Sequence, residues 1–324
     1  MKTRGFTLIE LLLVVAILSA TALAAFGLVS EDRAQIRIDD TRNRLNILRR
    51  AIVGIDGPAY GGEVRLSGFV ADNGRLPASI AELRSNNLES SPMLSQLARS
   101  VKFSGNTDTT CVQTGTLDDV GPAAAAITLT KGHRGDYLSG ASGAFRDGWG
   151  NVGTETDISE TSTFDETDDV NFGWTFMPGP PLQIASNGLD NLPDGEKDAR
   201  TTIAEADWTV DLTGWKVTIR NRTSASLSAL SDLQAALLVF RNTGTNGEWL
   251  RYSSGKCDTD IAVDESCIVT FPGPGACPGV PIGRHLLVLL SASGVYPSST
   301  APVTVPLDFF PGVQLPNATL EVRP

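Results

Sequence analysis

The sequence predicts an α+β protein: a long N-terminal transmembrane and amphipathic helix packed on a small antiparallel-sheet head, then a C-terminal β-sandwich-like domain. Three observations lead to this prediction. An apolar run covers residues 6–29, and a helical apolar stripe follows it. The middle of the chain alternates short apolar segments with Gly, Asp, Asn, Thr and Ser. From residue 209 onward, several short β-like segments lie between turn residues.

The composition is that of a globular protein with two folded units. The 324 residues are 41% hydrophobic and 19% charged, which is enough apolar material for a sizeable core. The formal net charge is -11. This charge disfavours binding to nucleic acid and to anionic lipid, because both are negatively charged themselves.

The first thirty residues have the features of a membrane helix. Lys2 and Arg4 precede the apolar run, which at about 1.5 Å per residue spans a bilayer core. These basic residues predict a cytoplasmic N-terminus, with the chain after Ser30 outside the inner membrane. Glu10 is the one charged residue inside the run. An unpaired carboxylate is costly there, so Glu10 is a functional candidate.

The heptapeptide Gly5-Phe6-Thr7-Leu8-Ile9-Glu10-Leu11 closely resembles the prepilin, or class III, signal. The resemblance implies that prepilin peptidase cuts between Gly5 and Phe6 and methylates Phe6. It also implies that Glu10 meets the free amine of a neighbouring subunit, since pairing relieves the cost of two charges in a low dielectric. The alternative is an uncleaved signal anchor whose Glu10 lies near the lipid headgroups.

The helix is predicted to continue over residues 30–56 and to stop at Gly57-Pro58. Asp39 with Arg42 and Asp40 with Arg44 have the spacing of ion pairs on its outer face. An apolar stripe on the other face consists of Ile38, Thr41, Leu45, Leu48, Ile52 and Ile55.

Residues 57–208 resemble the head of a major pseudopilin of type II secretion, so that the resemblance covers about residues 1–208. It rests on the order of several motifs, and the acidic stretch Gly153–Val170 is an insertion among them. The motifs are Pro77-x-Ser79-x-x-x-Leu83, Asp147-x-Trp149-Gly150-Asn151, an aromatic strand at residues 172–176, and Ser186-x-Gly188-x-Asp190.

The resemblance also implies a calcium site in the loop that follows. The segment from Asp190 to Asp198 offers closely spaced carboxylate oxygens and a glycine, which suits calcium. Carry-over from the family is firm for Asp190, whereas the loop is longer here. The alternative is a solvated acidic turn. The predicted ligands are Asp190, Asp194, Asp198 and Asp207.

The four cysteines lie outside the first hundred residues and form no CxxC pair, which disfavours zinc and favours disulfides. Three full pairings exist, and a link among the last three is favoured. The cysteines are Cys111, Cys257, Cys267 and Cys277.

Catalysis has no support in the sequence, and we expect the chain not to be an enzyme. His133 and His285 are too far apart in sequence to suggest a triad or a metal cluster. No G-x-S-x-G or HExxH motif occurs. Trp149 and Trp174 are expected to be core aromatic residues.

The C-terminal part lies beyond the pseudopilin resemblance. It is predicted to be an accessory domain that either recognises a partner or decorates the filament surface. Its predicted strands are residues 215–220, 235–240, 267–271, 285–290, 303–307 and 319–323. The complete prediction is a leader at 1–5, a transmembrane helix at 6–29, an amphipathic extension at 30–56, a head at 57–208 and the accessory domain at 209–324.

The predicted function is that of a structural subunit of a type II secretion pseudopilus. Expected partners are prepilin peptidase, further copies of the chain, other pseudopilins, the inner-membrane assembly platform and secreted substrates. The protein is expected to be a single-pass inner-membrane protein whose filament lies in the periplasm. The alternatives are a minor pilin of a type IV pilus and a membrane-anchored periplasmic binding protein that never polymerises.

Overall fold

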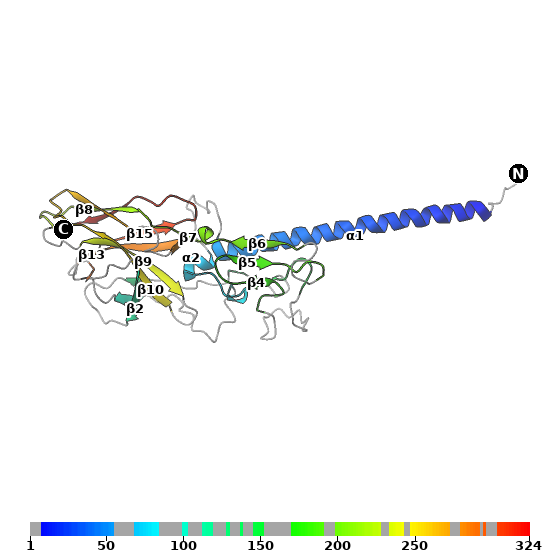
Figure 1. Ribbon diagram of the computed structural model, residues 1–324, viewed down its shortest axis with the longest axis horizontal. Helices are drawn as coiled ribbons and strands as arrows, with labels where there is room; N and C mark the ends of the chain where they lie inside the picture. The colour runs from blue at the N-terminus through cyan, green and yellow to red at the C-terminus, as the bar shows by residue number, and fades with distance from the viewer. Residues whose placement is uncertain are drawn as a thin grey trace. The chain divides into compact units, whose positions relative to one another are not determined.

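The computed structural model (Figure 1) forms two compact units. Unit 1 consists of Met1–Asn46, Ala141–Thr175 and Ile184–Arg200, and unit 2 of Ile47–Gly140, Phe176–Gln183 and Thr201–Pro324. The structure describes residues 8–54, 68–83, 99–102, 112–118, 128–129, 137–138, 145–151, 170–190, 198–227, 233–242, 247–272, 279–291, 294–295 and 303–324.

The N-terminal helix α1 (Leu8–Val53) is one continuous helix (Figure 1). It ends four residues before the predicted Gly57-Pro58. The reason is Gly54, which adopts a φ of 102° and donates its N–H to the carbonyl of Arg50 at 2.8 Å. A transmembrane helix was predicted at 6–29. Within the described part of the chain, which starts at Leu8, no helix combines the length and the apolar character needed to cross a membrane.

The predicted stripe on the second half of α1 is buried at Thr41, Leu45, Leu48 and Ile52. Their spacing of three or four residues places them on one face of the helix. On the remaining surface, the two predicted ion pairs form. Arg44 lies 2.9 Å from Asp40, and Arg42 lies 3.6 Å from Asp39.

A three-stranded sheet contains β4 (Thr175–Met177), β5 (Leu182–Ala185) and β6 (Arg200–Ile203), with β5 in the centre. The prediction of a strand over 172–176 was wrong in its first half. Phe172 has a φ of 53°, and the N–H of Trp174 donates to the carbonyl of Asn171, so these residues form a turn before β4. The alternating aromatic residues therefore belong partly to a buried turn, at Phe172 and Trp174, and partly to strand β4, at Phe176.

In the described part of the chain, the largest sheet has eight strands, and its strands pair antiparallel. Its order is β14-β13-β9-β10-β2-β1-β3, with β15 also pairing with β13. The strands are β1 (Arg99–Lys102), β2 (Val112–Asp118), β3 (Thr128–Leu129), β9 (Gln234–Asn242), β10 (Gly247–Lys256), β13 (Gly283–Ser291), β14 (Gly294–Val295) and β15 (Thr304–Phe309).

Strand β9 is buried on both faces of this sheet. Leu237 and Val239 are buried on one face, and the alternate residues Ala236, Leu238 and Phe240 are buried on the other. The second set belongs to a core cluster that includes Trp249 of β10, whose ring meets that of Phe240 edge to face. A strand covered on both faces reads as a continuous apolar run, which is why the sequence predicted it.

A smaller sheet consists of β11 (Ser266–Thr270), β8 (Lys216–Asn221) and β16 (Ala318–Val322), with β16 parallel to β8. Trp215 stacks on Phe271 at 4.9 Å between ring centroids and meets Phe309 of β15 edge to face. These rings connect the smaller sheet to the large one. Cys257 and Cys267 form a disulfide, with their Cα atoms 6.2 Å apart, between the end of β10 and β11.

The remaining elements are short. They are α2 (Phe69–Asn73), a 3-10 turn η1 (Ala81–Leu83), a 3-10 turn η3 (Glu205–Asp207), and the paired strands β7 (Thr209–Val210) and β12 (Val280–Pro281). Gly283, with a φ of 133°, allows α2 to approach β13, because an added Cβ would lie 2.8 Å from the carbonyl oxygen of Ala71.

The structure confirms an N-terminal helix followed by a mostly antiparallel, β-rich C-terminal region. Each predicted C-terminal strand overlaps an observed one, namely β8, β9, β11, β13, β15 or β16. The predicted boundary between residues 208 and 209 separates two strands that are neighbours in the large sheet. Trp249 of β10 is in register with Gly115 of β2.

Candidate functional site

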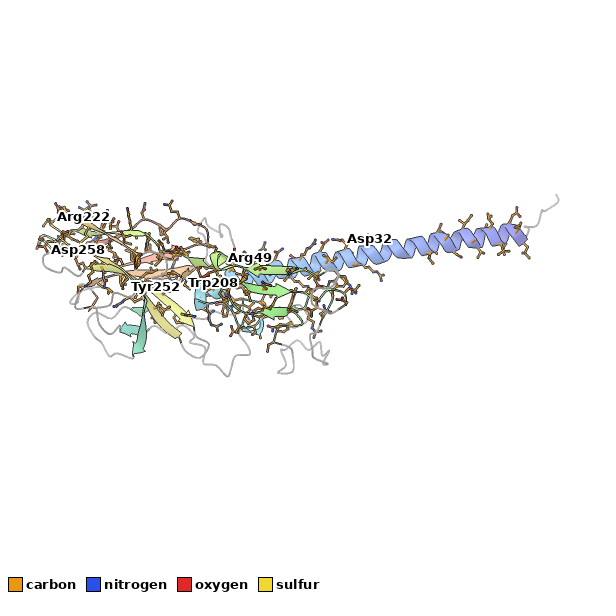
Figure 2. All side chains as sticks on the ribbon, in the orientation of Figure 1. Asp32, Arg49, Trp208, Arg222, Tyr252 and Asp258 are labelled. Atoms are coloured by element: carbon orange, nitrogen blue, oxygen red, sulfur yellow. A yellow bond between two sulfur atoms is a disulfide. The ribbon has the colours of Figure 1, made fainter. Side chains whose placement is uncertain are left out.

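The first part of α1 is apolar on every side. Leu8 and Ile9 are 78% and 74% exposed, and large apolar side chains remain exposed around the helix as far as Leu23. Figure 2 shows side chains extending from all around this helix. A helix that is apolar all round needs lipid or other helices to cover it. This surface is therefore the first candidate functional site.

The polar groups of this segment are suited to an apolar environment. The hydroxyl of Ser19 donates to the carbonyl of Val15 at 2.8 Å, and that of Thr21 is 3.0 Å from the carbonyls of Ile17 and Leu18. The helix thus satisfies these hydroxyls internally. Glu10 is the single charged residue between residues 8 and 23, and its side chain is exposed. Gly5 and Phe6 lie outside the described residues, so the processing site stays a prediction.

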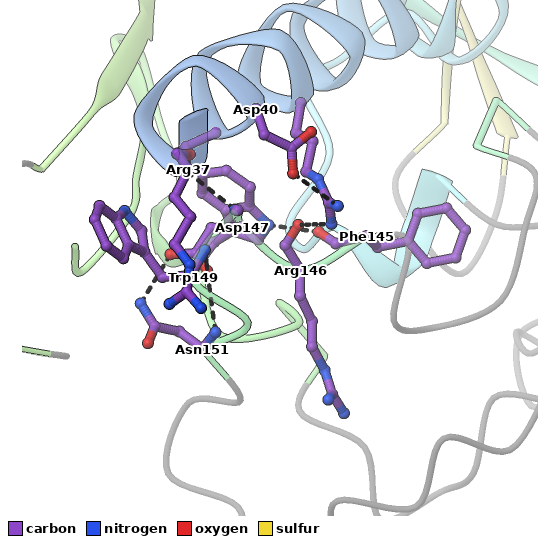
Figure 3. A network of polar contacts seen from close by, with 11 residues as sticks. Arg37, Asp40, Phe145, Arg146, Asp147, Trp149 and Asn151 are labelled. Carbon is purple, nitrogen blue, oxygen red and sulfur yellow. Dashed lines mark hydrogen bonds and ion pairs between the residues drawn. The ribbon is translucent and has the colours of Figure 1, made fainter. Parts of the chain in front are cut away.

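The second site is the loop around Asp147, in unit 1 (Figure 3). The Asp147 carboxylate is 2% exposed and accepts four hydrogen bonds. Its Oδ1 accepts the backbone N–H groups of Trp149 and Asn151 at 3.1 and 3.0 Å. Its Oδ2 accepts the Asn151 side-chain amide at 2.8 Å and the Ser186 hydroxyl at 2.5 Å. This buried carboxylate therefore joins two of the motifs that carried the pseudopilin resemblance.

Gly188 completes the junction between these motifs. Its carbonyl accepts the Asn151 amide at 3.0 Å, and its N–H donates to the Ser186 hydroxyl at 3.1 Å. Asp190, the next predicted site residue, follows directly and is exposed. The Asp147 loop thus fixes the start of the acidic segment.

The same loop packs directly on α1. The N–H of Gly148 donates to the Thr41 hydroxyl at 3.0 Å, and that hydroxyl donates to the carbonyl of Arg37 at 2.7 Å. A Cβ added at Gly148 would lie 2.3 Å from the Arg37 carbonyl oxygen, so only glycine fits. Sequence reasoning had assigned Thr41 to the apolar stripe. A hydroxyl among the apolar residues of this stripe was the one feature of the sequence that could have indicated a hydrogen bond to the packed loop.

Arginines of α1 hold the rest of the loop. Arg44 donates to the carbonyl of Arg146 at 2.7 Å while it pairs with Asp40. The Arg37 guanidinium lies over the Trp149 ring, 5.6 Å from its centroid. Trp149 is half-buried by these contacts. Trp174 is buried and donates its indole N–H to the carbonyl of Phe145 at 2.6 Å.

The predicted calcium ligands lie in different surroundings. Asp190 is exposed, Asp198 is half-buried, and Asp194 lies outside the described residues. The carboxylate of Asp207 is already engaged, because Arg49 lies 3.1 Å from its Oδ1 and the N–H of Ala204 donates to its Oδ2 at 2.8 Å. Within the described ranges, no three His, Cys, Asp or Glu side chains form a group that could hold a metal ion.

Some of the other predicted site residues lie within the described ranges, and some lie outside them. Cys257 and Cys267 are joined, whereas Cys111 and Cys277 lie outside the described residues. His133 also lies outside them. The His285 ring is buried, with Nε2 2.7 Å from the carbonyl of Pro281.

Comparison with known proteins adds one match. A family described as the prokaryotic N-terminal methylation motif matches residues 1–26. No curated protein and no solved structure matches the chain. The match supports a type IV pilin-like protein of a pilus or a pseudopilus, and it implies processing by a prepilin peptidase and assembly with other pilin subunits.

Proposed function

We propose that the chain is a structural subunit of a type II secretion pseudopilus that supports the export of folded proteins. The main support for this proposal comes from the N-terminal segment. A prepilin-type motif at residues 1–26 leads into a helix whose apolar side chains are exposed on all sides over residues 8–23. Covering that surface with lipid, and then with neighbouring helices, would remove apolar area from water.

The proposed sequence of events follows from this N-terminus. The precursor is anchored in the inner membrane with residues 1–5 in the cytoplasm and the chain after Ser30 in the periplasm. Prepilin peptidase cuts after Gly5 and methylates Phe6. The assembly platform then packs α1 against the helices of other copies and of other pseudopilins. Glu10 sets the register by pairing with the neighbouring N-terminal amine, since each charge is costly alone in apolar surroundings.

The secretion role is tested by deleting the gene and scoring secreted proteins and surface pili in the same cells. We expect exoproteins to collect in the periplasm while pili remain. Normal secretion with loss of pili, twitching or adhesion would instead support the alternative, a minor pilin of a type IV pilus.

Glu10→Ala tests polymerisation itself. We expect the leader to be removed normally and the filament to be lost, because the N-terminal amine then has no carboxylate to meet. Cross-linking in membranes and the mass of the processed chain measure the two steps. Ser19→Ala is the control, since the Ser19 hydroxyl is bonded within its own helix. Absence of subunit cross-links in the unsubstituted chain and in Glu10→Ala alike would favour a membrane-anchored binding protein that never polymerises.

Calcium is proposed for the acidic segment from Asp190 to Asp198, whose carboxylate oxygens suit that ion. Binding to the native state should raise the melting temperature of the full-length chain with added calcium, and a chelator should reverse the rise. Asp190→Asn should weaken this response, and Asp258→Asn, on another exposed loop, should not. No response at millimolar calcium would remove the metal from the proposal.

Unit 2 is proposed to carry the contacts with secreted substrates or with other subunits. The proposal includes no catalytic role. Its support is the strand-rich part of unit 2 at residues 209–324, which lies beyond the pseudopilin resemblance. Deleting residues 209–324 would also remove β10, the partner of β2, so surface substitutions are the better test of this role.

A further inference from the structure

We infer that Arg49 is the cation that fixes Asp207, and that Asp207 is a positioning residue for the start of the C-terminal strands and not a metal ligand. All the residues involved belong to unit 2. The inference removes Asp207 from the calcium ligands predicted from the sequence, and it rests on contacts that are independent of any metal. Arg49 and the neighbouring Trp208 are labelled in Figure 2.

The Arg49 guanidinium connects α1 to two consecutive elements. Its NH1 donates to the carbonyl of Thr202 in β6 at 2.9 Å. Its NH2 lies 3.1 Å from Oδ1 of Asp207 in η3. The planar guanidinium can hold both acceptors at once, whereas a lysine offers one point charge. Arg49 therefore ties both the strand and the turn after it to the helix.

Asp207 uses its second oxygen to close the turn. Oδ2 accepts the N–H of Ala204 at 2.8 Å, while the N–H of Asp207 donates to the carbonyl of Ala204 at 3.0 Å. A carboxylate with an arginine on one oxygen and an amide on the other is poorly placed to bind a cation. Calcium would have to displace a positive charge that the chain itself supplies.

The turn leads directly into the C-terminal strands. The carbonyl of Trp208 accepts the N–H of Ile282 at 2.9 Å, and the next residues form β7, which pairs with β12. β13 of the large sheet begins at Gly283, one residue after Ile282. The Arg49–Asp207 pair thus holds the point at which the chain passes from the helix-packed segment into the sheets.

The test is a double-mutant cycle on the full-length chain in detergent, with Arg49→Gln, Asp207→Asn and both together. Because the two side chains are each 35% exposed, we expect each single change to lower the melting temperature by about 1–3 °C. We expect the double variant to be little worse than either single one. Arg49→Lys should recover part of the loss. Arg42→Gln, which removes a more exposed pair on the same helix, is the control.

Two further readouts distinguish positioning from metal binding. Amide exchange at Ala204 should accelerate in Arg49→Gln and Asp207→Asn but not in Arg42→Gln. The calcium response of the melting temperature should be the same in Asp207→Asn as in the unsubstituted chain. Additive single effects, or loss of the calcium response in Asp207→Asn with a stronger one in Arg49→Gln, would overturn the inference. Absence of any calcium response would reject the calcium proposal and leave the cycle as the test of Arg49.

Discussion

Asp147 shows how much structure one buried carboxylate can organise. Four donors from Trp149, Asn151 and Ser186 converge on it, and they come from two separate segments of unit 1. Hydrogen bonds to a charged acceptor are stronger than neutral ones, and without it the buried Ser186 hydroxyl and three part-buried donors would lose their acceptor. Asp147 is therefore needed for the local fold of unit 1.

Asp147→Ala should lower the free energy of unfolding by about 3 kcal/mol, because it leaves one buried and three part-buried donors without an acceptor. Urea denaturation of the full-length chain in detergent measures the change. Asp258→Asn, at an exposed carboxylate in unit 2, is the control and should stay within about 0.5 kcal/mol of the unsubstituted chain. A loss below about 1 kcal/mol for Asp147→Ala would contradict this account.

At the scale of elements, the single helix α1 has two parts with different surfaces. Its first part presents apolar side chains in all directions, and its second part buries one stripe while arginines on the adjoining surface hold the Asp147 loop. The change occurs without a break in the helix. One continuous helix therefore combines an exposed apolar part with a part that holds the Asp147 loop.

Gly148→Ala tests the close approach between this helix and the loop. The new methyl group would meet the Arg37 carbonyl oxygen at 2.3 Å, and helix backbone cannot move away cheaply. We expect a loss of about 2 kcal/mol or more in stability, with faster amide exchange at Trp149 and at the substituted position. Gly255→Ala, where the nearest atom lies 3.5 Å away, is the control. Equal stability of the two variants would mean that the loop is held less tightly than its contacts indicate.

The sequence predicted those elements whose cause is local. Helical spacing predicted the buried stripe and both ion pairs, and continuous apolar runs predicted β9 and β13. Strand β10 was missed because Gly247, Ser253, Ser254 and Gly255 hide the strand pattern around its buried Trp249 and Tyr252. The Arg49–Asp207 pair was also beyond prediction, since many arginines and carboxylates offered equivalent partners.

For the whole molecule, the disulfide joins the end of a strand of the large sheet to a strand of the smaller one. Closing the loop from Cys257 to Cys267, a sequence separation of 10, restricts the unfolded chain and should stabilise unit 2 by about 2–3 kcal/mol. Cys257→Ser with Cys267→Ser should lower the stability by this amount, and reductant should then cause no further loss from this bond. Ser266→Ala, at the exposed residue next to Cys267, is the control for a change in β11 that leaves the disulfide intact. Equal stability with and without the bond would contradict the prediction.

The pairing of β2 with β10 has a consequence for how the protein is made. A ribosome synthesises residues 112–118 long before residues 247–256, so the first strand waits through more than a hundred further residues for its neighbour. During that interval residues 112–115 of β2 lack the partner that β10 supplies, although β1 is already available to residues 116–118. The early strand is therefore completed only when a late one arrives, and slowing elongation near the C-terminus should lengthen the interval in which it can pair wrongly.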